Sequence, residues 1–148
     1  MPPPNEPPLI QNPSGSSDQA LRVLVVDDEP RLRRSLRLLL EQPGREIHEC
    51  ATGAEALKAL GRSHYDLVLL DLRLPDMTGL QVMDRLLSRP FPPSIIVVSA
   101  DDVIDSAIGA LRRGAYDFVR KPYQPDQLLH TVDNALQRKS LERTNALI

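Results

Sequence analysis

The chain has 148 residues, of which 41% are hydrophobic and 26% are charged, values typical of one globular domain with a tail at either end. Its net charge of -2 excludes an overall basic field that would attract nucleic acid or an anionic membrane. No apolar run approaches the roughly 20 residues of a membrane span, and the N-terminus does not resemble a signal peptide. Cys50 is the only cysteine, which excludes an internal disulfide and favours a cytoplasmic location.

Residues 1–19 are rich in Pro, Ser, Gly and Asn and nearly lack large apolar side chains. Such a segment buries too little surface to offset its ordering entropy, so we expect a disordered leader. A polyproline-II ligand is the alternative, because Pro4 and Pro7 satisfy a PxxP pattern. We expect the folded domain over residues 20–137, with residues 138–148 forming a helical extension or the start of a linker.

Strand patterns recur along this domain. Three segments, at 23–26, 67–70 and 94–99, have the composition of strands buried on both faces; the first two are unbroken apolar runs and the third is apolar between Ser94 and Ser99. A short strand is expected around Ile47, Glu49 and Ala51, and a last one over 117–122. Each is followed by a helical pattern.

The helices have recognisable starts. Pro30 suits a first helical position, Thr52 with Glu55 forms a capping-box pattern, and further helices are expected over 78–88, over 103–113 and from Pro125. Ile104, Ile108 and Leu111 supply the apolar side of the fourth helix. Five alternations of strand and helix predict an α/β fold, a doubly wound five-stranded parallel sheet with helices on both faces.

Reactive side chains follow several of these strands. Asp27 and Asp28 follow the first strand, Asp71 the third, Ser99 ends the fourth, and Lys121 stands at the end of the fifth. In open parallel sheets, ligands bind beyond the carboxyl ends of the strands, so these side chains should meet. Asp71 as a helix N-cap is the alternative, but Pro75 and Gly79 argue against a helix starting there.

Crowded carboxylates repel one another unless a cation holds them, and Mg²⁺ suits one to a few carboxylates while leaving room for water and phosphate. A lysine and a hydroxyl facing that ion could bind the remaining oxygens of a phosphoryl group. The set therefore predicts phosphoryl transfer to a carboxylate nucleophile, Asp71.

Four segments, at 25–30, 69–79, 97–100 and 114–122, resemble the receiver domain of response regulators in two-component signalling. The resemblance covers about residues 21–137 and implies a flavodoxin-like (βα)5 fold. It implies a phosphohistidine of a sensor histidine kinase or phosphotransfer protein as the donor to Asp71. It also implies that this domain is a phosphoacceptor with slow autodephosphorylation rather than an enzyme that turns over.

The same resemblance assigns roles to single residues. Asp28 would bind Mg²⁺ directly, Asp27 directly or through water, and the backbone carbonyl of Arg73 would add a ligand. Lys121 would pair with the phosphoryl oxygens, and the Lys121–Pro122 bond would be cis. Ser99 would swing toward the phosphate and Phe118 would rotate into the vacated space.

Two alternatives compete with this interpretation. A phosphohydrolase forming an aspartyl phosphate usually has a second acid two residues after the nucleophile, where this chain has Arg73. A dinucleotide-binding module is disfavoured because no glycine-rich phosphate loop is present.

The residues after Gln137 allow two interpretations. Helix-favouring residues continue past Gln137, and Leu141, Asn145 and Ile148 follow coiled-coil spacing, which suggests a homodimer seam or otherwise a solvated tail. No output domain follows Gln137 in this sequence, so either the protein docks to partners or a longer chain carries an output domain. Arg73 and Asp101 are further expected to flank the phosphorylation site and slow its hydrolysis.

Overall fold

The computed structural model describes residues 20–100 and 104–146. Within these ranges strands and helices alternate throughout. The elements are β1 (Leu21–Val26), α2 (Pro30–Leu40), β2 (Arg45–Cys50), α3 (Gly53–Arg62), β3 (Leu67–Leu70), α4 (Gly79–Leu87), β4 (Ser94–Ser99), α5 (Ile104–Arg113), β5 (Asp117–Arg120) and α6 (Pro125–Ala146). The leader expected over residues 1–19 lies outside the described residues.

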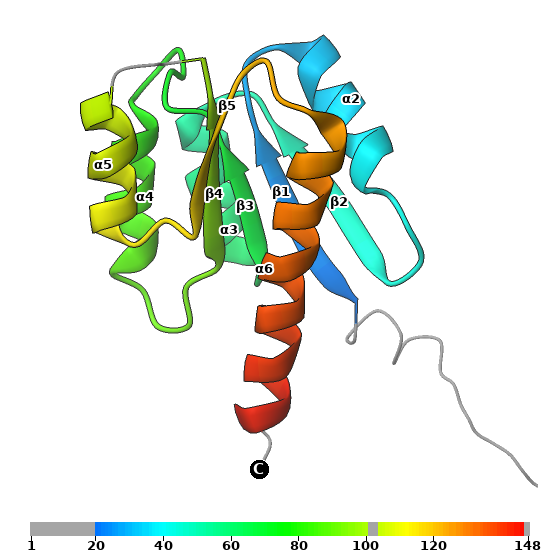
Figure 1. The fold of residues 1–148 in the computed structure, drawn as a ribbon. Coiled ribbons are helices and arrows are strands. Elements are labelled where there is room, and N and C mark those ends of the chain that lie inside the picture. Colours follow the sequence, from blue (N-terminus) through cyan, green and yellow to red (C-terminus); the bar gives the residue numbers. More distant parts are fainter. Residues whose placement is uncertain (1–19, 101–103, 147–148) are drawn as a thin grey trace, which may run out of the picture.

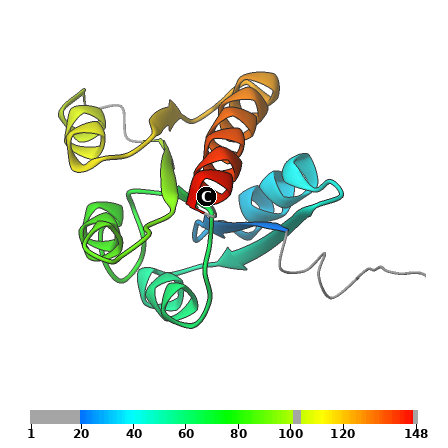
Figure 2. The same cartoon turned by 90° about the horizontal axis from the view of Figure 1, so that it is seen from below.

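One parallel sheet joins all five strands in the order β2-β1-β3-β4-β5. Helices α2 and α6 cover one face, and α3, α4 and α5 cover the other, as Figures 1 and 2 show. The predicted doubly wound parallel sheet is therefore confirmed. Because successive strand side chains point to opposite faces, β1 contributes Val23 and Val25 to one core and Leu24 and Val26 to the other.

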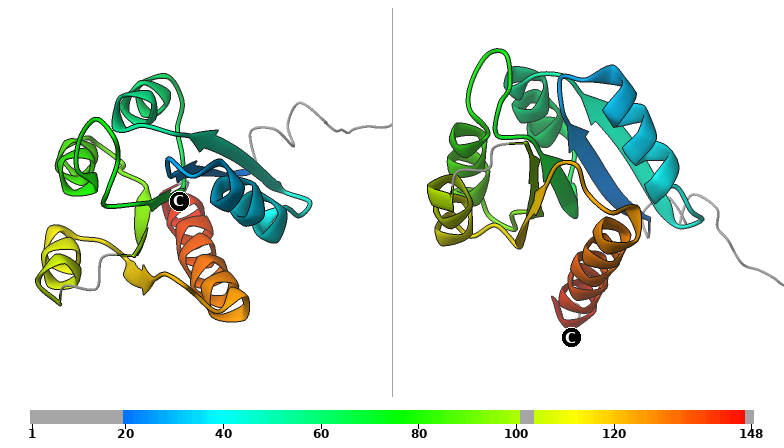
Figure 3. Two further views of the ribbon diagram at one scale, coloured as in Figure 1. Left: turned by 90° about the horizontal axis from the view of Figure 1, so that it is seen from above. Right: turned by 45° about the horizontal axis from the view of Figure 1, so that its top comes forward.

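The register of the sheet aligns the ends of β1 and β3, while β4 continues past this level to Ser99. Val26 pairs with Leu70, and Leu70 in turn pairs with Val97 of β4. The backbone amide of Asp71 continues the ladder by donating to the carbonyl of Val26, and the amide of Lys121 donates to the carbonyl of Ser99. The residues just beyond β1, β3, β4 and β5 therefore reach one edge of the sheet, which faces the viewer in the left view of Figure 3.

The helix starts agree with the sequence except in one detail. Pro30 is the first residue of α2, and Thr52 caps α3 by accepting a hydrogen bond from the amide of Glu55. The Glu55 carboxylate accepts from the amide of Ala51 rather than from Thr52, so the predicted capping box of α3 is incomplete. A complete box forms instead at α4, between Thr78 and Gln81.

The prediction that Ile108 and Leu111 form the buried side of α5 was wrong, and the side chain of Ile104 lies outside the described part of the structure. Ile108 is 41% exposed and Leu111 is 47% exposed, whereas Ala110 is fully buried. Helix α5 approaches the sheet through a small residue, which leaves these bulkier side chains outside. The predicted strand around Ile47 is also shifted, because β2 begins at Arg45 and ends at Cys50.

Helix α6 continues well past the residues that cover the sheet and projects beyond its lower end (Figure 1). The Nζ of Lys139 donates to the carbonyl of Pro92, and the guanidinium of Arg143 lies 3.5 Å from the buried carboxylate of Asp66. The extension is thus tied to the body of the domain by polar contacts, while Leu141 is 60% exposed. No helix in the described ranges is both long and apolar enough to span a bilayer.

Candidate functional site

Three carboxylates meet at the carboxyl edge of the sheet. Asp27 and Asp28 follow β1 and Asp71 follows β3, and each offers a carboxylate oxygen within 4.8 Å of those of the other two. Asp27 and Asp71 are 3% and 7% exposed, whereas Asp28 is exposed to solvent. The predicted clustering of these acids is therefore present in the structure.

Lys121 lies between the two buried acids. Its Nζ is 2.7 Å from Oδ2 of Asp27 and 2.9 Å from Oδ2 of Asp71. Lys121 directly follows β5, and its peptide bond to Pro122 is cis. The ammonium group compensates part of the negative charge that these carboxylates place in a poorly solvated position.

The other oxygen of Asp71 is held by two donors. The Ser99 hydroxyl, completely buried at the end of β4, donates to Oδ1 of Asp71 across 3.1 Å, and the backbone amide of Arg73 donates to the same atom across 3.0 Å. Both oxygens of the carboxylate are therefore hydrogen bonded, which fixes its orientation at the edge of the sheet.

Burial and pairing affect the titration of the cluster in opposite ways. Burial raises the pKa of Asp27 above its ordinary value, although hydrogen bonds from Lys121 and from the amide of Glu29 offset part of this effect. Partial burial of Lys121 would lower its pKa, but the hydrogen bonds to Asp27 and Asp71 outweigh it, so the pKa is raised. Lys121 therefore stays positively charged at neutral pH.

The loop after Asp71 folds back on the site. Arg73 and Thr78 form an isolated antiparallel bridge, and the amide of Gly79 donates to the carbonyl of Leu72. A Cβ atom at Gly79 would lie 2.4 Å from the carbonyl oxygen of Asp71, so only glycine fits there. The Arg73 side chain is exposed. Its expected partner Asp101 lies outside the described residues.

Two residues that contact the backbone around the site, Arg33 and Asp76, were not identified from the sequence. Arg33 on α2 donates to the backbone carbonyl of Asp27 across 2.6 Å and also pairs with Glu49 of β2. Asp76 accepts hydrogen bonds from the amides of Gly53 and Ala54, the first residues of α3. The partners are 6 to 23 residues away in the chain, so no local pattern reveals these contacts.

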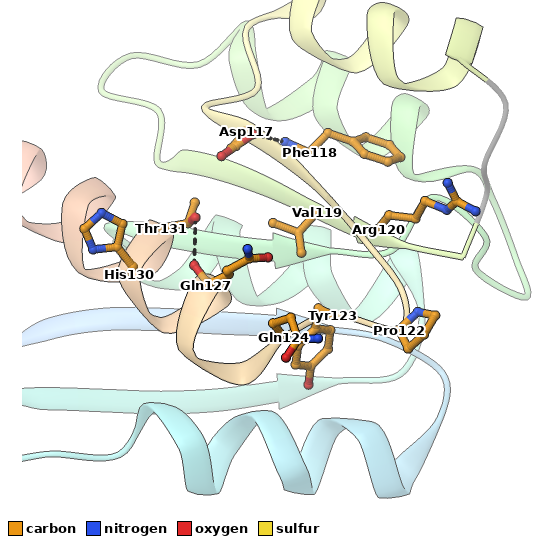
Figure 4. A pocket seen from close by; sticks show the side chains of 10 residues that line it. All are labelled: Asp117, Phe118, Val119, Arg120, Pro122, Tyr123, Gln124, Gln127, His130 and Thr131. Carbon is orange, nitrogen blue, oxygen red and sulfur yellow. Dashed lines mark hydrogen bonds between the residues drawn. The ribbon is translucent and has the colours of Figure 1, made fainter.

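Phe118 lies on β5, three residues before Lys121, and is not part of the acidic cluster. Its ring is partly buried against the core under α3, α4 and α5. Figure 4 shows it extending to the α5 side of β5, whereas Val119 lies on the side that faces α6. On that second side, residues of β5 and α6 line a pocket of about 430 Å³.

Cys50 also ends a strand at this edge, but its chemistry is different. The thiol is buried, and burial raises its pKa to about 11. A thiol that stays protonated at neutral pH is a poor nucleophile and a poor metal ligand. Cys50 is therefore a core residue and not a candidate nucleophile.

Comparison with known proteins identifies the family to which the chain is similar. The model of the response regulator receiver domain matches residues 23–133. Regulatory protein LuxO of Vibrio cholerae is 38% identical over 116 residues, which are 78% of this chain and 26% of LuxO. Regulatory protein AtoC of Escherichia coli is 36% identical over 122 residues, 82% of this chain and 26% of AtoC. Transcriptional regulatory protein SrrA of Staphylococcus aureus is 37% identical over 78% of this chain and 48% of SrrA.

Solved structures agree with this result. The signal receiver domain of a putative LuxO repressor protein from Vibrio parahaemolyticus has a TM-score of 0.80 at 34% identity, covering 84% of this chain and 96% of that one. A CheY-like receiver domain from Methanospirillum hungatei has a TM-score of 0.76 at 29% identity, covering 83% and 98%. This chain spans from about a quarter to about half the length of the curated relatives named above. The chain belongs to the response regulator receiver domain family.

Proposed function

We propose that this receiver domain accepts a phosphoryl group on Asp71 from a phosphohistidine of a sensor histidine kinase or phosphotransfer protein. The observation that carries the proposal is the set of contacts around Asp71. Its carboxylate is oriented by Lys121 and Ser99 and stands beside two further acids. A pocket of about 400 Å³ beside Lys121 leaves this side of the site open to a partner.

The residues present fit a magnesium ion. Asp27, Asp28 and Asp71 bring hard oxygen donors within 4.8 Å of one another, and the partly compensated charge of the cluster favours a cation. We assign these three carboxylates and the backbone carbonyl of Arg73 as its ligands. Bound there, Mg²⁺ would neutralise the cluster and polarise the phosphoryl oxygens.

In the transfer step, one carboxylate oxygen of Asp71 attacks phosphorus and forms a P–O bond. The P–N bond to the donor histidine breaks, and its electron pair leaves with the imidazole of the partner. Lys121 and Ser99 already contact the two oxygens of Asp71, so small shifts bring both donors onto the incoming phosphoryl oxygens. Charge that develops on those oxygens is thereby stabilised.

The phosphorylated state would be transmitted through Ser99 and Phe118. The Ser99 hydroxyl would exchange its bond with Asp71 for one with the phosphoryl group, and Phe118 would move further into the core it already contacts. The surface formed by α5, β5 and α6 would change with it and alter binding to a partner, to a second copy or to an output domain in a longer chain.

We assign the domain as a stoichiometric phosphoacceptor that acts in the cytoplasm, not as an enzyme that turns over. A phosphohydrolase would also form an aspartyl phosphate, but the position two residues after Asp71 carries Arg73 instead of a second acid. The folded domain is assigned to residues 20–137, with 138–148 as an extension.

Incubation with a small phosphodonor and Mg²⁺ tests the assignment. The wild-type protein should be labelled once per chain, and Asp71→Asn should abolish the labelling because it removes the nucleophilic charge while keeping the shape. Asp105→Asn, which changes an exposed acid on α5, is the control and should label normally. Labelling of the Asp71→Asn protein, or release of many phosphates per chain, would contradict the proposal.

A further inference from the structure

Asp76 stands at the turn of the loop that follows Asp71. Its Oδ1 accepts a hydrogen bond from the amide of Gly53, and its Oδ2 accepts one from the amide of Ala54, both at 2.8 Å. These are the first two amides of α3, and Thr52 satisfies the third. The first turn of α3 is therefore capped mainly by a side chain from a different loop.

The next residue strengthens the same contact. The side chain of Met77 lies against Gly53 so closely that a Cβ at Gly53 would be 2.4 Å from its Cγ. The hydrogen bonds from Gly53 and Ala54 also lower the pKa of Asp76, so its carboxylate is charged at neutral pH. A negative charge at the N-terminus of a helix is favourable, which makes this an attachment point for the loop.

The other part of the loop contacts the phosphorylation site. The amide of Arg73 donates to Asp71, and Arg73 is paired with Thr78 across the loop. Asp76 lies between these paired residues in the chain. The Arg73–Thr78 bridge therefore connects the segment that carries Asp76 to the backbone beside Asp71.

We propose that Asp76 is a positioning residue that sets the Mg²⁺ affinity of the acidic cluster by holding the loop of Arg73 against α3. The inference rests on the proposed function of Asp71 and deepens it. Asp76 does not touch the reacting atoms. It acts through the Arg73 backbone, which needs a fixed position to offer a ligand to the ion.

The test is a Mg²⁺ titration of the unphosphorylated protein, followed by amide chemical shifts. Asp76→Ala should weaken Mg²⁺ binding by about tenfold, as loss of an outer hydrogen bond around a metal site does. Asp76→Asn should have an intermediate effect, because its single amide oxygen replaces one of the two bonds. Should Asp76→Ala fail to fold, the nearly isosteric Asp76→Asn decides the question.

Thr52→Ala is the matched control. It removes a cap from the same turn of α3 but leaves the loop attached, so Mg²⁺ affinity should stay near that of the wild type. Equal weakening in Thr52→Ala and Asp76→Ala would overturn the proposal in favour of general destabilisation of α3. Unchanged Mg²⁺ affinity in Asp76→Ala, with shifted Gly53 and Ala54 amide signals, would also overturn it.

These results are separable from the proposed function. The titration requires no phosphoryl transfer, so it decides the role of Asp76 even if labelling shows that Asp71 is not the acceptor. Conversely, single labelling of Asp71 together with unchanged Mg²⁺ affinity in Asp76→Ala leaves the proposed function standing and refutes only this inference.

Discussion

The ammonium group of Lys121 lies 2.9 Å from the Oδ2 atom of Asp71, although the two residues are 50 positions apart in the chain. The ammonium group also contacts Oδ2 of Asp27, so Lys121 supplies positive charge to two of the three clustered carboxylates. On our proposal, Lys121 therefore competes with Mg²⁺ for these carboxylates and also donates to the phosphoryl group. These two roles predict opposite effects of removing it.

Lys121→Met should bind Mg²⁺ more tightly, by about tenfold, since one positive charge is removed beside the carboxylates. Labelling by a small phosphodonor should nevertheless fall by about 100-fold, because a donor to the developing charge is lost. Calorimetric titration and labelling rates measure the two effects. Lys139→Met, a lysine at the opposite end of the molecule, is the control.

The same Lys121→Met variant should be less stable to heat without Mg²⁺, because two buried carboxylates lose their common partner. Added Mg²⁺ should recover part of the loss by binding the folded state. Weaker Mg²⁺ binding in this variant would contradict the view of Lys121 as a competitor.

Helix α6 provides the next prediction. Leu141 is exposed on the extension, and we expect it to contribute to a homodimer seam with Asn145 and Ile148. Leu141→Asp and truncation after Gln137 should each lower the sedimentation coefficient to that of a monomer, because both remove the expected seam. Leu38→Asp, at an exposed leucine of α2, should not. An unchanged sedimentation profile in both test variants would leave the extension as a solvated tail.

Asp76 gives the stability of the fold a defined pH dependence. Its pKa is lowered from 3.8 by the amides of Gly53 and Ala54, so its stabilising effect is complete above 3.8 and is lost as the pH falls through the lower folded value. The difference in free energy of unfolding between wild type and Asp76→Asn should be constant from pH 7 to about 5 and shrink below 3.8. Urea unfolding at several pH values measures it, with Asp105→Asn as the charge control. A difference that grows in acid would contradict the role of the two amides.

Much of the fold could be predicted from the sequence because short apolar runs identify the buried strands. The apolar runs ending at Val26, Leu70 and Ser99 are too short for helices and too apolar for exposed strands, and a parallel sheet brings their carboxyl ends together. The meeting of Asp27, Asp71 and Ser99 was predictable for this reason. The resemblance to receiver domains added the cis bond at Pro122, which the structure confirms.

The remaining features depend on contacts that a single sequence does not reveal. Asp76 looks like an ordinary loop acid until the fold brings Gly53 beside it. Asp66 precedes β3 without any visible pattern, yet it is 1% exposed and contacts Arg143 of α6. The apolar side of α5 was mispredicted because spacing alone does not reveal that Ala110, rather than Ile108 or Leu111, faces the sheet.

The close approach of Gly79 to Asp71 has a consequence for how this sequence can diverge. Any side chain at position 79 would collide with the backbone of Asp71 and Leu72, which cannot move without displacing Asp71 from the acidic cluster. A Cβ atom at Gly61, in contrast, would have no neighbour within 4 Å, so packing places no such restriction on substitutions at that position. Among relatives that keep the acidic cluster of Asp27, Asp28 and Asp71, position 79 should stay glycine, and its replacement should mark relatives in which the cluster has been lost.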